Sequence, residues 1–373
     1  MKIPPFKLER YFAQYEFDVE TLLCSSDCES MTIADLLALE PGAHDAFQQQ
    51  WLGYTESQGS PSLRRQICGL YRTIAPHQVL VHTGAEEAIF LFMHAALSPD
   101  DHIIVHWPCY QSLVEVARAI GCQVSLWRAH EERGWALDLG ELRGLLRPNT
   151  RVIVINTPHN PTGYHMSPET FQDVSQIAAA NGILLFSDEV YRESEYRSAD
   201  RLPAACDLGD HAVSLGVMSK TYGLAGLRIG WVATHNAGVT ARIASLKDYT
   251  TICNSAPSEF LAELALRHRE TLVEGTVALL TRNLALLDGF FERHAGHFAW
   301  HRPQAGPIAF PRLIGEDVEG FCDRLVREAS ILLLPGTMYD DRANHFRIGF
   351  GRRNMPQALA RLEAFLAYPR SSV

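Results

Sequence analysis

Apolar and polar positions follow two rhythms through the middle of the chain. Short runs rich in Val, Ile and Leu predict strands at 79–84, 102–106, 151–156, 183–189 and 212–217. Between them, apolar residues recur at helical spacing over 85–97, 111–121 and 167–182. Strands that alternate with helices predict an α/β fold, in which a mostly parallel sheet is flanked by helices on both faces.

The two ends of the chain have a different pattern. Residues 286–373 combine short apolar runs with helical segments and predict a smaller α+β domain. Residues 1–45 are expected to pack against that domain as an N-terminal arm, which leaves 46–285 as the large domain. A long helical pattern near 257–295 is the expected connector.

Composition restricts the class of partner. The net charge of the 373 residues is −10, which argues against nucleic acid. No apolar run approaches the roughly 18 residues of a membrane span, and the N-terminus lacks a signal-peptide core. We therefore expect no membrane partner and a cytoplasmic location. Cys24 and Cys28 form a lone CxxxC without a second pair, so we expect no metal site.

Lysine is rare in this chain. Of 33 basic residues, four are lysines, at positions 2, 7, 220 and 247. Lys220 lies in the Gly-rich apolar stretch SKTYGLAGLRIGW. Because a desolvated lysine can lose its proton and attack a carbonyl, whereas arginine stays protonated, this position suggests a Schiff base with an aldehyde cofactor.

Two motifs follow predicted strands and provide partners for a pyridine ring. SDEVY places Asp188 at a strand end, where a buried carboxylate would keep a ring nitrogen protonated, and Tyr191 follows three residues on. NPTG places Asn160 after another strand, where its amide would bond a phenolic oxygen. Alone, Asp188 reads equally as a helix cap, and the NPTG motif as a turn.

Four further positions suggest ligand contacts. HTGAEEAIF begins a helix at Gly84, Ala85 and Glu86, whose free amides would bind phosphate, although an ordinary strand–helix turn has the same pattern. Arg228 offers a guanidinium for phosphate or for a surface ion pair. The other two are Tyr110, which reads as a stacking ring or as core, and Arg347, which reads as a carboxylate ligand or as an internal salt bridge.

With these motifs in this order, residues 30–365 resemble the class I/II aminotransferases, which are fold type I pyridoxal-phosphate enzymes. The matching segments are NPTG, SDEVY, SKTYGLAGLRIGW and FRIGF. The resemblance implies that Lys220 forms the Schiff base with pyridoxal 5′-phosphate. It also implies that Asp188 pairs with the ring nitrogen, that Asn160 and Tyr191 bond the ring oxygen, and that Tyr110 stacks on the ring.

The same resemblance implies the remaining contacts. Arg347 would bind the substrate α-carboxylate. Tyr54, in the segment GYTESQGSPSLR, would reach the cofactor phosphate of a partner subunit, so a homodimer is expected. The implied contacts to the cofactor phosphate and its surroundings include Gly84, Ala85, Glu86, Ser219 and Arg228.

This sequence departs from the family pattern at three places. Val217 occupies a position where a hydroxyl residue often touches phosphate, so that donor is missing. The stacking position holds Tyr110 rather than the Trp of aspartate-type members. The arm is faintly similar to capreomycidine-synthase-like members, which places residues 25–27 (Ser, Ser, Asp) at the border of the substrate pocket.

The implied activity is transfer of an amino group between an L-amino acid and a 2-oxoacid, with Lys220 as the general base at Cα. A β-eliminating lyase and a capreomycidine-synthase-like cyclase are alternatives on the same fold. A transcription regulator built on this fold places a winged-helix domain first, for which residues 1–50 leave no room. The substrate side chain cannot be read from the sequence.

Overall fold

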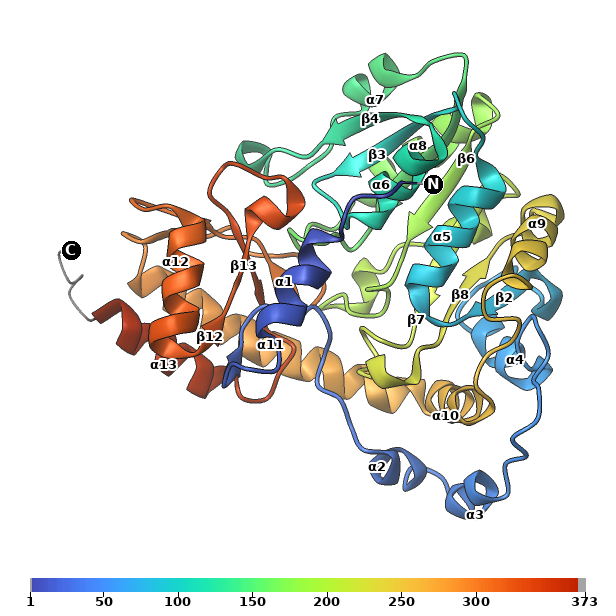
Figure 1. Ribbon diagram of the computed structural model, residues 1–373, viewed down its shortest axis with the longest axis horizontal. Helices are drawn as coiled ribbons and strands as arrows, with labels where there is room; N and C mark the ends of the chain where they lie inside the picture. Colours follow the sequence, from blue (N-terminus) through green and yellow to red (C-terminus); the bar gives the residue numbers. More distant parts are fainter. Residues whose placement is uncertain (1, 368–373) are drawn as a thin grey trace.

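The computed structural model describes residues 2–367, and its largest element is a seven-stranded sheet (Figure 1). The strand order is β2-β8-β7-β6-β5-β3-β4, and every neighbouring pair is parallel except those that involve β8. The strands are β2 (Val79–His82), β3 (His102–Trp107), β4 (Gln123–Arg128), β5 (Thr150–Asn156), β6 (Leu184–Asp188), β7 (Ala212–Val217) and β8 (Gly230–Ala233). This arrangement confirms the predicted α/β class with a mostly parallel sheet.

Helices cover both faces of this sheet. The first group consists of α5 (Gly84–Ala96), α6 (Ser112–Ile120) and α9 (Ala237–Lys247), which share one apolar cluster with the strands. A second cluster contains α7 (Leu139–Leu145) and α8 (Pro168–Ala180). The Ser167 hydroxyl caps α8 by accepting a hydrogen bond from the amide of Thr170 at 3.2 Å. The sheet is therefore buried on both sides, as its continuous apolar strands require.

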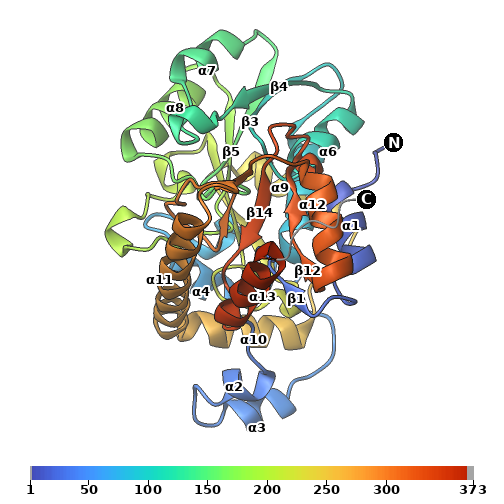
Figure 2. The ribbon, with the colours of Figure 1, turned by 90° about the vertical axis from the view of Figure 1, so that its left-hand side faces the viewer.

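The C-terminal part packs around an apolar cluster of its own, separate from the two clusters that flank the large sheet. It contains a three-stranded antiparallel sheet, one short pair of strands and a further strand that pairs with the N-terminal segment, seen beside α12 and α13 in Figure 2. Its elements are α11 (Arg269–Arg293), β9 (Phe298–Ala299), β10 (Ile308–Ala309), β11 (Arg312–Leu313), α12 (Val318–Arg324), β12 (Ile331–Leu332), β13 (Leu334–Pro335), β14 (Phe346–Gly349) and α13 (Met355–Ala367).

The connector differs from the expected single helix. The pattern near 257–295 forms two helices, because α10 (Ala256–Arg267) ends before His268 and α11 begins after it. The backbone of His268, at φ −105° and ψ 21°, departs from helical geometry. The apolar spacing continues through this break, so the pattern alone could not locate it.

The N-terminal segment contacts both halves of the chain. After α1 (Lys7–Tyr15), strand β1 (Thr21–Leu22) pairs in parallel with β12. Further along, α2 (Ile33–Leu37) packs against α10, and α3 (Ala43–Gln48) and α4 (Pro61–Cys68) follow. The proposed division of the chain at residues 45 and 285 stays a prediction.

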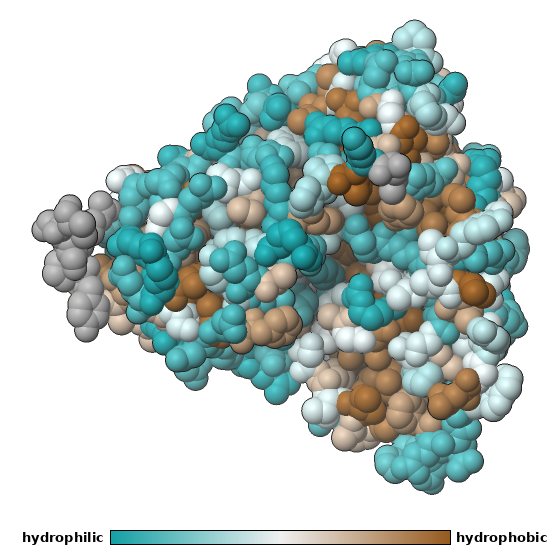
Figure 3. Space-filling model, viewed as in Figure 1, coloured by the Kyte–Doolittle hydropathy of each residue, from teal (hydrophilic) through white to brown (hydrophobic). Residues whose placement is uncertain are grey.

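The surface is mostly polar, with apolar residues gathered over α10 on the face in Figure 3. In the described residues, five large apolar side chains are strongly exposed: Phe17, Trp51, Leu52, Tyr54 and Tyr249. Across residues 2–367, no helix is both long enough and apolar enough to cross a membrane.

Candidate active site

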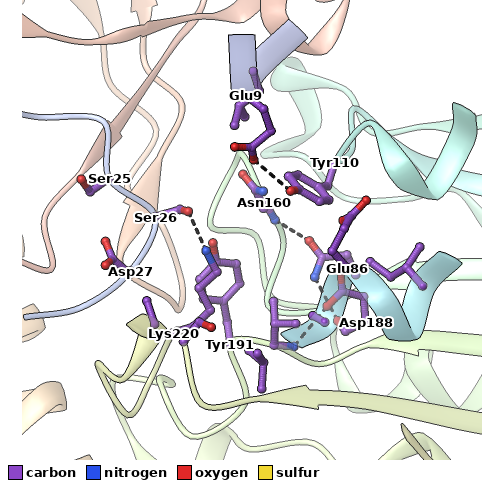
Figure 4. Close-up of a pocket in the computed structure, with 18 of the residues that line it drawn as sticks. Glu9, Ser25, Ser26, Asp27, Glu86, Tyr110, Asn160, Asp188, Tyr191 and Lys220 are labelled. Carbon is purple, nitrogen blue, oxygen red and sulfur yellow. Dashed lines mark hydrogen bonds between the residues drawn. The ribbon is translucent and has the colours of Figure 1, made fainter. Parts of the chain in front are cut away.

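A cavity of about 400 Å³ lies beyond the carboxyl ends of β5, β6 and β7 (Figure 4). Side chains from the sheet, from α1, from the segment after β1 and from β14 line it. Ten of the predicted site residues lie on its wall: Ala85, Glu86, Tyr110, Asn160, Asp188, Tyr191, Ser219, Lys220, Arg228 and Arg347. Ligands of α/β sheets bind at this edge, so the topology brings the separate motifs together.

Strand register positions the base of the cavity. Asn156 and Asp188 are the last residues of β5 and β6, and they are paired across the two strands. The Asn156 side chain donates to the Asp188 backbone carbonyl at 2.9 Å and accepts a hydrogen bond from the backbone N–H of Asn160 at 2.6 Å. Asn156 therefore orders both predicted ring contacts, although the sequence analysis did not single it out.

Lys220 comes from the loop after β7 and points toward the arm (Figure 4). Its Nζ donates a hydrogen bond to the Ser26 hydroxyl at 2.8 Å. Burial lowers the pKa of Lys220 below its usual range. The amine is thus biased toward the neutral form that a nucleophile or base requires.

Asp188 lies across the cavity from Lys220 (Figure 4), and 4% of its surface is exposed. Burial raises the pKa of this carboxyl to about 7, although the Val190 amide and the charge of Lys220 act in the other direction. A cation placed against Asp188 would return it to the ionised form. The position therefore suits a carboxylate that is stabilised in its ionised form only when a protonated ring nitrogen binds next to it.

The first turn of α5 and Arg228 form a cradle for an anion. Gly84 has a φ of +82°, and a Cβ there would lie 2.6 Å from Nη2 of Arg228. Arg228 itself adopts a left-handed φ of 52° and donates to the Ala225 carbonyl at 3.2 Å. Burial raises the pKa of nearby Glu86 to about 7, so this acid is less negative than an ordinary glutamate. Gly84 does not line the cavity itself, but its missing side chain leaves room for the Arg228 guanidinium.

Arg347 is 1% exposed and has no carboxylate partner within residues 2–367. Its guanidinium donates to the Cys24 carbonyl at 2.7 and 3.1 Å and to the Tyr339 hydroxyl at 2.5 Å. The Tyr339 hydroxyl in turn donates to Oδ1 of Asn160 at 2.8 Å, which leaves the amide NH₂ of Asn160 for a ligand. A buried arginine with only neutral partners is suited to bind an anion.

The two aromatic candidates have different settings. Tyr191 is 1% exposed, and its ring centroid lies 6.0 Å from Nζ of Lys220. Tyr110 packs on Phe6 with centroids 4.9 Å apart and donates its hydroxyl to Glu9 at 3.2 Å. Both rings face the cavity.

Tyr54 is not brought into this cavity. Its side chain is 85% exposed, and it lines a separate hollow with Leu52 and residues 253–257. Tyr54 is therefore not among the residues that line the cavity of Lys220.

Sequence reasoning missed the contribution of α1. Leu8, Glu9, Phe12 and Glu16 line the cavity, together with the anticipated Ser25, Ser26 and Asp27. The spacing of Leu8, Phe12 and Glu16 at i, i+4 and i+8 was the available signal, because such residues share a helix face.

The residues present fit pyridoxal phosphate. The cavity combines a desolvated amine, a buried carboxylate, an anion cradle and a free asparagine amide, which match the aldehyde, ring nitrogen, phosphate and ring oxygen of the cofactor. Val217 lines the wall without offering a donor. In the described part of the chain, no group of three or more His, Cys, Asp or Glu residues is arranged to hold a metal ion.

Comparison with known proteins agrees with this geometry. Residues 20–362 match the family model for aminotransferase class I and II. Capreomycidine synthase of Streptomyces vinaceus is 29% identical to this chain, in an alignment that covers 93% of this chain and 90% of the synthase. Aspartate aminotransferase of Thermotoga maritima is 27% identical over 88% of both chains. The crystal structure of a PLP-dependent aminotransferase from Streptococcus suis 89-1591 superimposes with a TM-score of 0.93 at 33% identity, over 98% of both chains. The chain therefore belongs to the class I and II aminotransferases, and it is a pyridoxal-phosphate-dependent enzyme of fold type I.

Proposed function

We propose that this aminotransferase moves the amino group of an L-amino acid to a 2-oxoacid with Lys220 as its proton carrier. The observation that carries the proposal is the pairing of a desolvated Lys220 amine with buried Asp188 across one cavity. When bound, pyridoxal phosphate supplies an aldehyde for the amino group and a ring that accepts electron density from Cα. The neutral Lys220 amine would remove the proton from the substrate Cα and deliver it to C4′, the former aldehyde carbon, so that the amino group stays behind when the 2-oxoacid is released by water.

The other residues of the cavity hold the reactants in place. Asp188 keeps the ring nitrogen protonated, and the free amide of Asn160 and the hydroxyl of Tyr191 donate to the ring oxygen. Arg228 and the first-turn amides of α5 bind the phosphate. Arg347 binds the substrate α-carboxylate, which fixes the direction of Cα relative to Lys220.

We also propose that the enzyme is a homodimer. Trp51, Leu52 and Tyr54 are 79%, 79% and 85% exposed, which is unusual for neighbouring large apolar side chains. A second copy would cover them and allow Tyr54 to reach the partner's phosphate site. Light scattering after gel filtration tests this assembly. A monomer with full activity would rule it out.

A cytoplasmic location is part of the same proposal. All eight cysteines lie in the described residues as free thiols, and five of them are buried. Free thiols persist in a reducing compartment. Fractionation of cells that produce the protein tests the location, and recovery outside the cytoplasm would contradict it.

The experiment that tests the reaction combines a spectrum, a covalent trap and an assay. The purified enzyme should have a visible absorption band, and borohydride should leave a pyridoxyl group on Lys220 in a peptide map. Lys220→Ala should lose turnover, whereas Lys7→Ala, which changes a half-exposed surface lysine, should retain it. Normal activity of Lys220→Ala would refute the proposal.

A second reaction is supported by the similarity to capreomycidine synthase. A cyclisation or a β-elimination would use the same cofactor and the same lysine but would consume no 2-oxoacid. Product formation by the enzyme with an amino acid alone, measured over many turnovers, would favour this alternative. Strict dependence on added 2-oxoacid would favour transamination.

A further inference from the structure

The charges on the cavity wall do not balance. Five carboxyl groups face three basic groups: Glu9, Glu16, Asp27, Glu86 and Asp188 against Lys220, Arg228 and Arg347. The proposed function already uses several of these groups. Asp188 pairs with the ring nitrogen, Arg228 with the phosphate and Arg347 with the substrate carboxylate, and Lys220 reacts with the cofactor aldehyde. No basic group of the wall is therefore left for the remaining acids.

Two of those acids lie on one face of α1. Glu9 is three residues before Phe12 and Glu16 is four residues after it, so all three side chains share the face that meets the cavity. The Phe12 ring lies 5.8 Å from the guanidinium carbon of Arg347. A substrate whose carboxylate binds Arg347 therefore has its side chain within the part of the cavity that α1 covers.

Among Glu9, Glu16 and Asp27, which lie on the arm side of the cavity, Glu16 has the fewest direct partners. Asp27 is paired with Arg352 at 2.9 Å, and Glu9 accepts a hydrogen bond from Tyr110. The Glu16 carboxylate has no hydrogen-bond or ion-pair partner within residues 2–367. Burial, Asp27 and Glu9 raise the pKa of Glu16, and they outweigh the charge of Arg352, which acts in the other direction and is itself paired with Asp27.

We propose that Glu16, with Glu9 beside it, selects an amino acid whose side chain ends in a guanidinium or ammonium group. This inference rests on the proposed function, because it takes Arg347 as the carboxylate site and the cavity as the place of reaction. A cationic side chain would supply the charge that the wall lacks. An acidic side chain would be repelled, and a neutral one would leave Glu16 without a directly bonded cation.

The test compares amino acids of matched shape on the holoenzyme. L-arginine and L-citrulline differ chiefly in the charge of the terminal group, and L-lysine and L-norleucine form a second pair. Binding is read from the change in cofactor absorption, and turnover is measured separately with a 2-oxoacid acceptor. We expect each cationic member to bind at least about tenfold more tightly than its neutral partner, with a preference that weakens at high salt.

Variants assign the preference to Glu16. Glu16→Gln should reduce the preference for L-arginine over L-citrulline to near unity, and Glu16→Lys should favour L-glutamate. Asp18→Asn, a change of an exposed acid that does not line the cavity, should retain the wild-type preference.

The outcomes separate the two proposals. Equal binding of charged and neutral partners by the wild-type enzyme would overturn the inference and leave the proposed function intact. A preference unchanged in Glu16→Gln would also overturn it. An enzyme that binds the cofactor but responds to no amino acid of the set would overturn this inference, whereas the proposed function fails only if no L-amino acid at all changes the cofactor spectrum.

Discussion

Asp188 is expected to destabilise the protein when the cofactor is removed. Its pKa rises from 3.8 to about 7 on folding because the carboxyl is buried. A raised carboxyl pKa means that folding favours the protonated form, so stability is complete below pH 3.8 and is lost as the pH rises toward 7. With about 1.4 kcal/mol for each pKa unit, the full loss is about 4 kcal/mol.

Asp188→Asn removes this titration with little change in size. In cofactor-free protein, the variant should gain free energy of unfolding relative to the wild type as the pH rises. The gain should increase by about 3 kcal/mol between pH 5 and pH 8, since part of the loss has already occurred at pH 5. Urea unfolding followed by tryptophan fluorescence measures both proteins at each pH. Asp45→Asn, at a side chain 91% exposed, is the control and should show no such trend.

Bound cofactor should reverse the order of stability of the two proteins at high pH, making the wild type more stable than Asp188→Asn. Pyridoxal phosphate would place a cation against the carboxylate, so the wild type should gain more stability from saturating cofactor than Asp188→Asn does. A stability difference that is constant from pH 5 to pH 8 would refute burial as the cause. The variant should also lose most turnover, because its amide cannot hold the ring nitrogen in the protonated form.

Three other changes test the site. Gly84→Ala should raise the Kd for pyridoxal phosphate at least about tenfold in an absorbance titration, since its Cβ would crowd Arg228 and its φ is +82°; an unchanged Kd would show that the cradle tolerates a side chain. Ser26→Ala should lower kcat about tenfold and shift the pH–rate profile, because it removes the hydrogen bond to Lys220, and Ser26→Thr should restore both. Arg347→Lys should raise KM for the amino acid about tenfold or more, because a guanidinium fork is replaced by a point charge. Unaltered kinetics in either of the last two variants would contradict the assigned contact.

Residues within contiguous motifs were predictable from the sequence. Asp188 ends one buried strand, and Asn160 and Lys220 follow two others, so the rule that ligands bind beyond the carboxyl ends of strands predicted that they lie together. The predicted strands formed near the expected bounds because β-branched runs buried on both faces leave little alternative.

Contacts across long separations could not be predicted. Tyr339 meets Asn160 over 179 residues, and nothing local marks that pairing. Glu9 and Glu16 reach the cavity only because α1 lies across it, which depends on tertiary packing rather than on helical spacing. Strands β4 and β8 were not among the predicted strands, and the antiparallel direction of β8 was not predicted either. Strand β8 has four residues and begins with Gly230, so it lacks the longer β-branched run that marks the predicted strands.

The pairing of β1 with β12 has a consequence for the nascent chain. Thr21 aligns with Ile331, and the Gly349 amide donates to the Leu23 carbonyl at 2.8 Å. The segment that carries Ser26 is thus made long before its pairing partners, and it has no fixed position until residues 331–349 have been made. Until then Lys220 lacks its hydroxyl partner, so a nascent chain that still lacks these residues has no complete site.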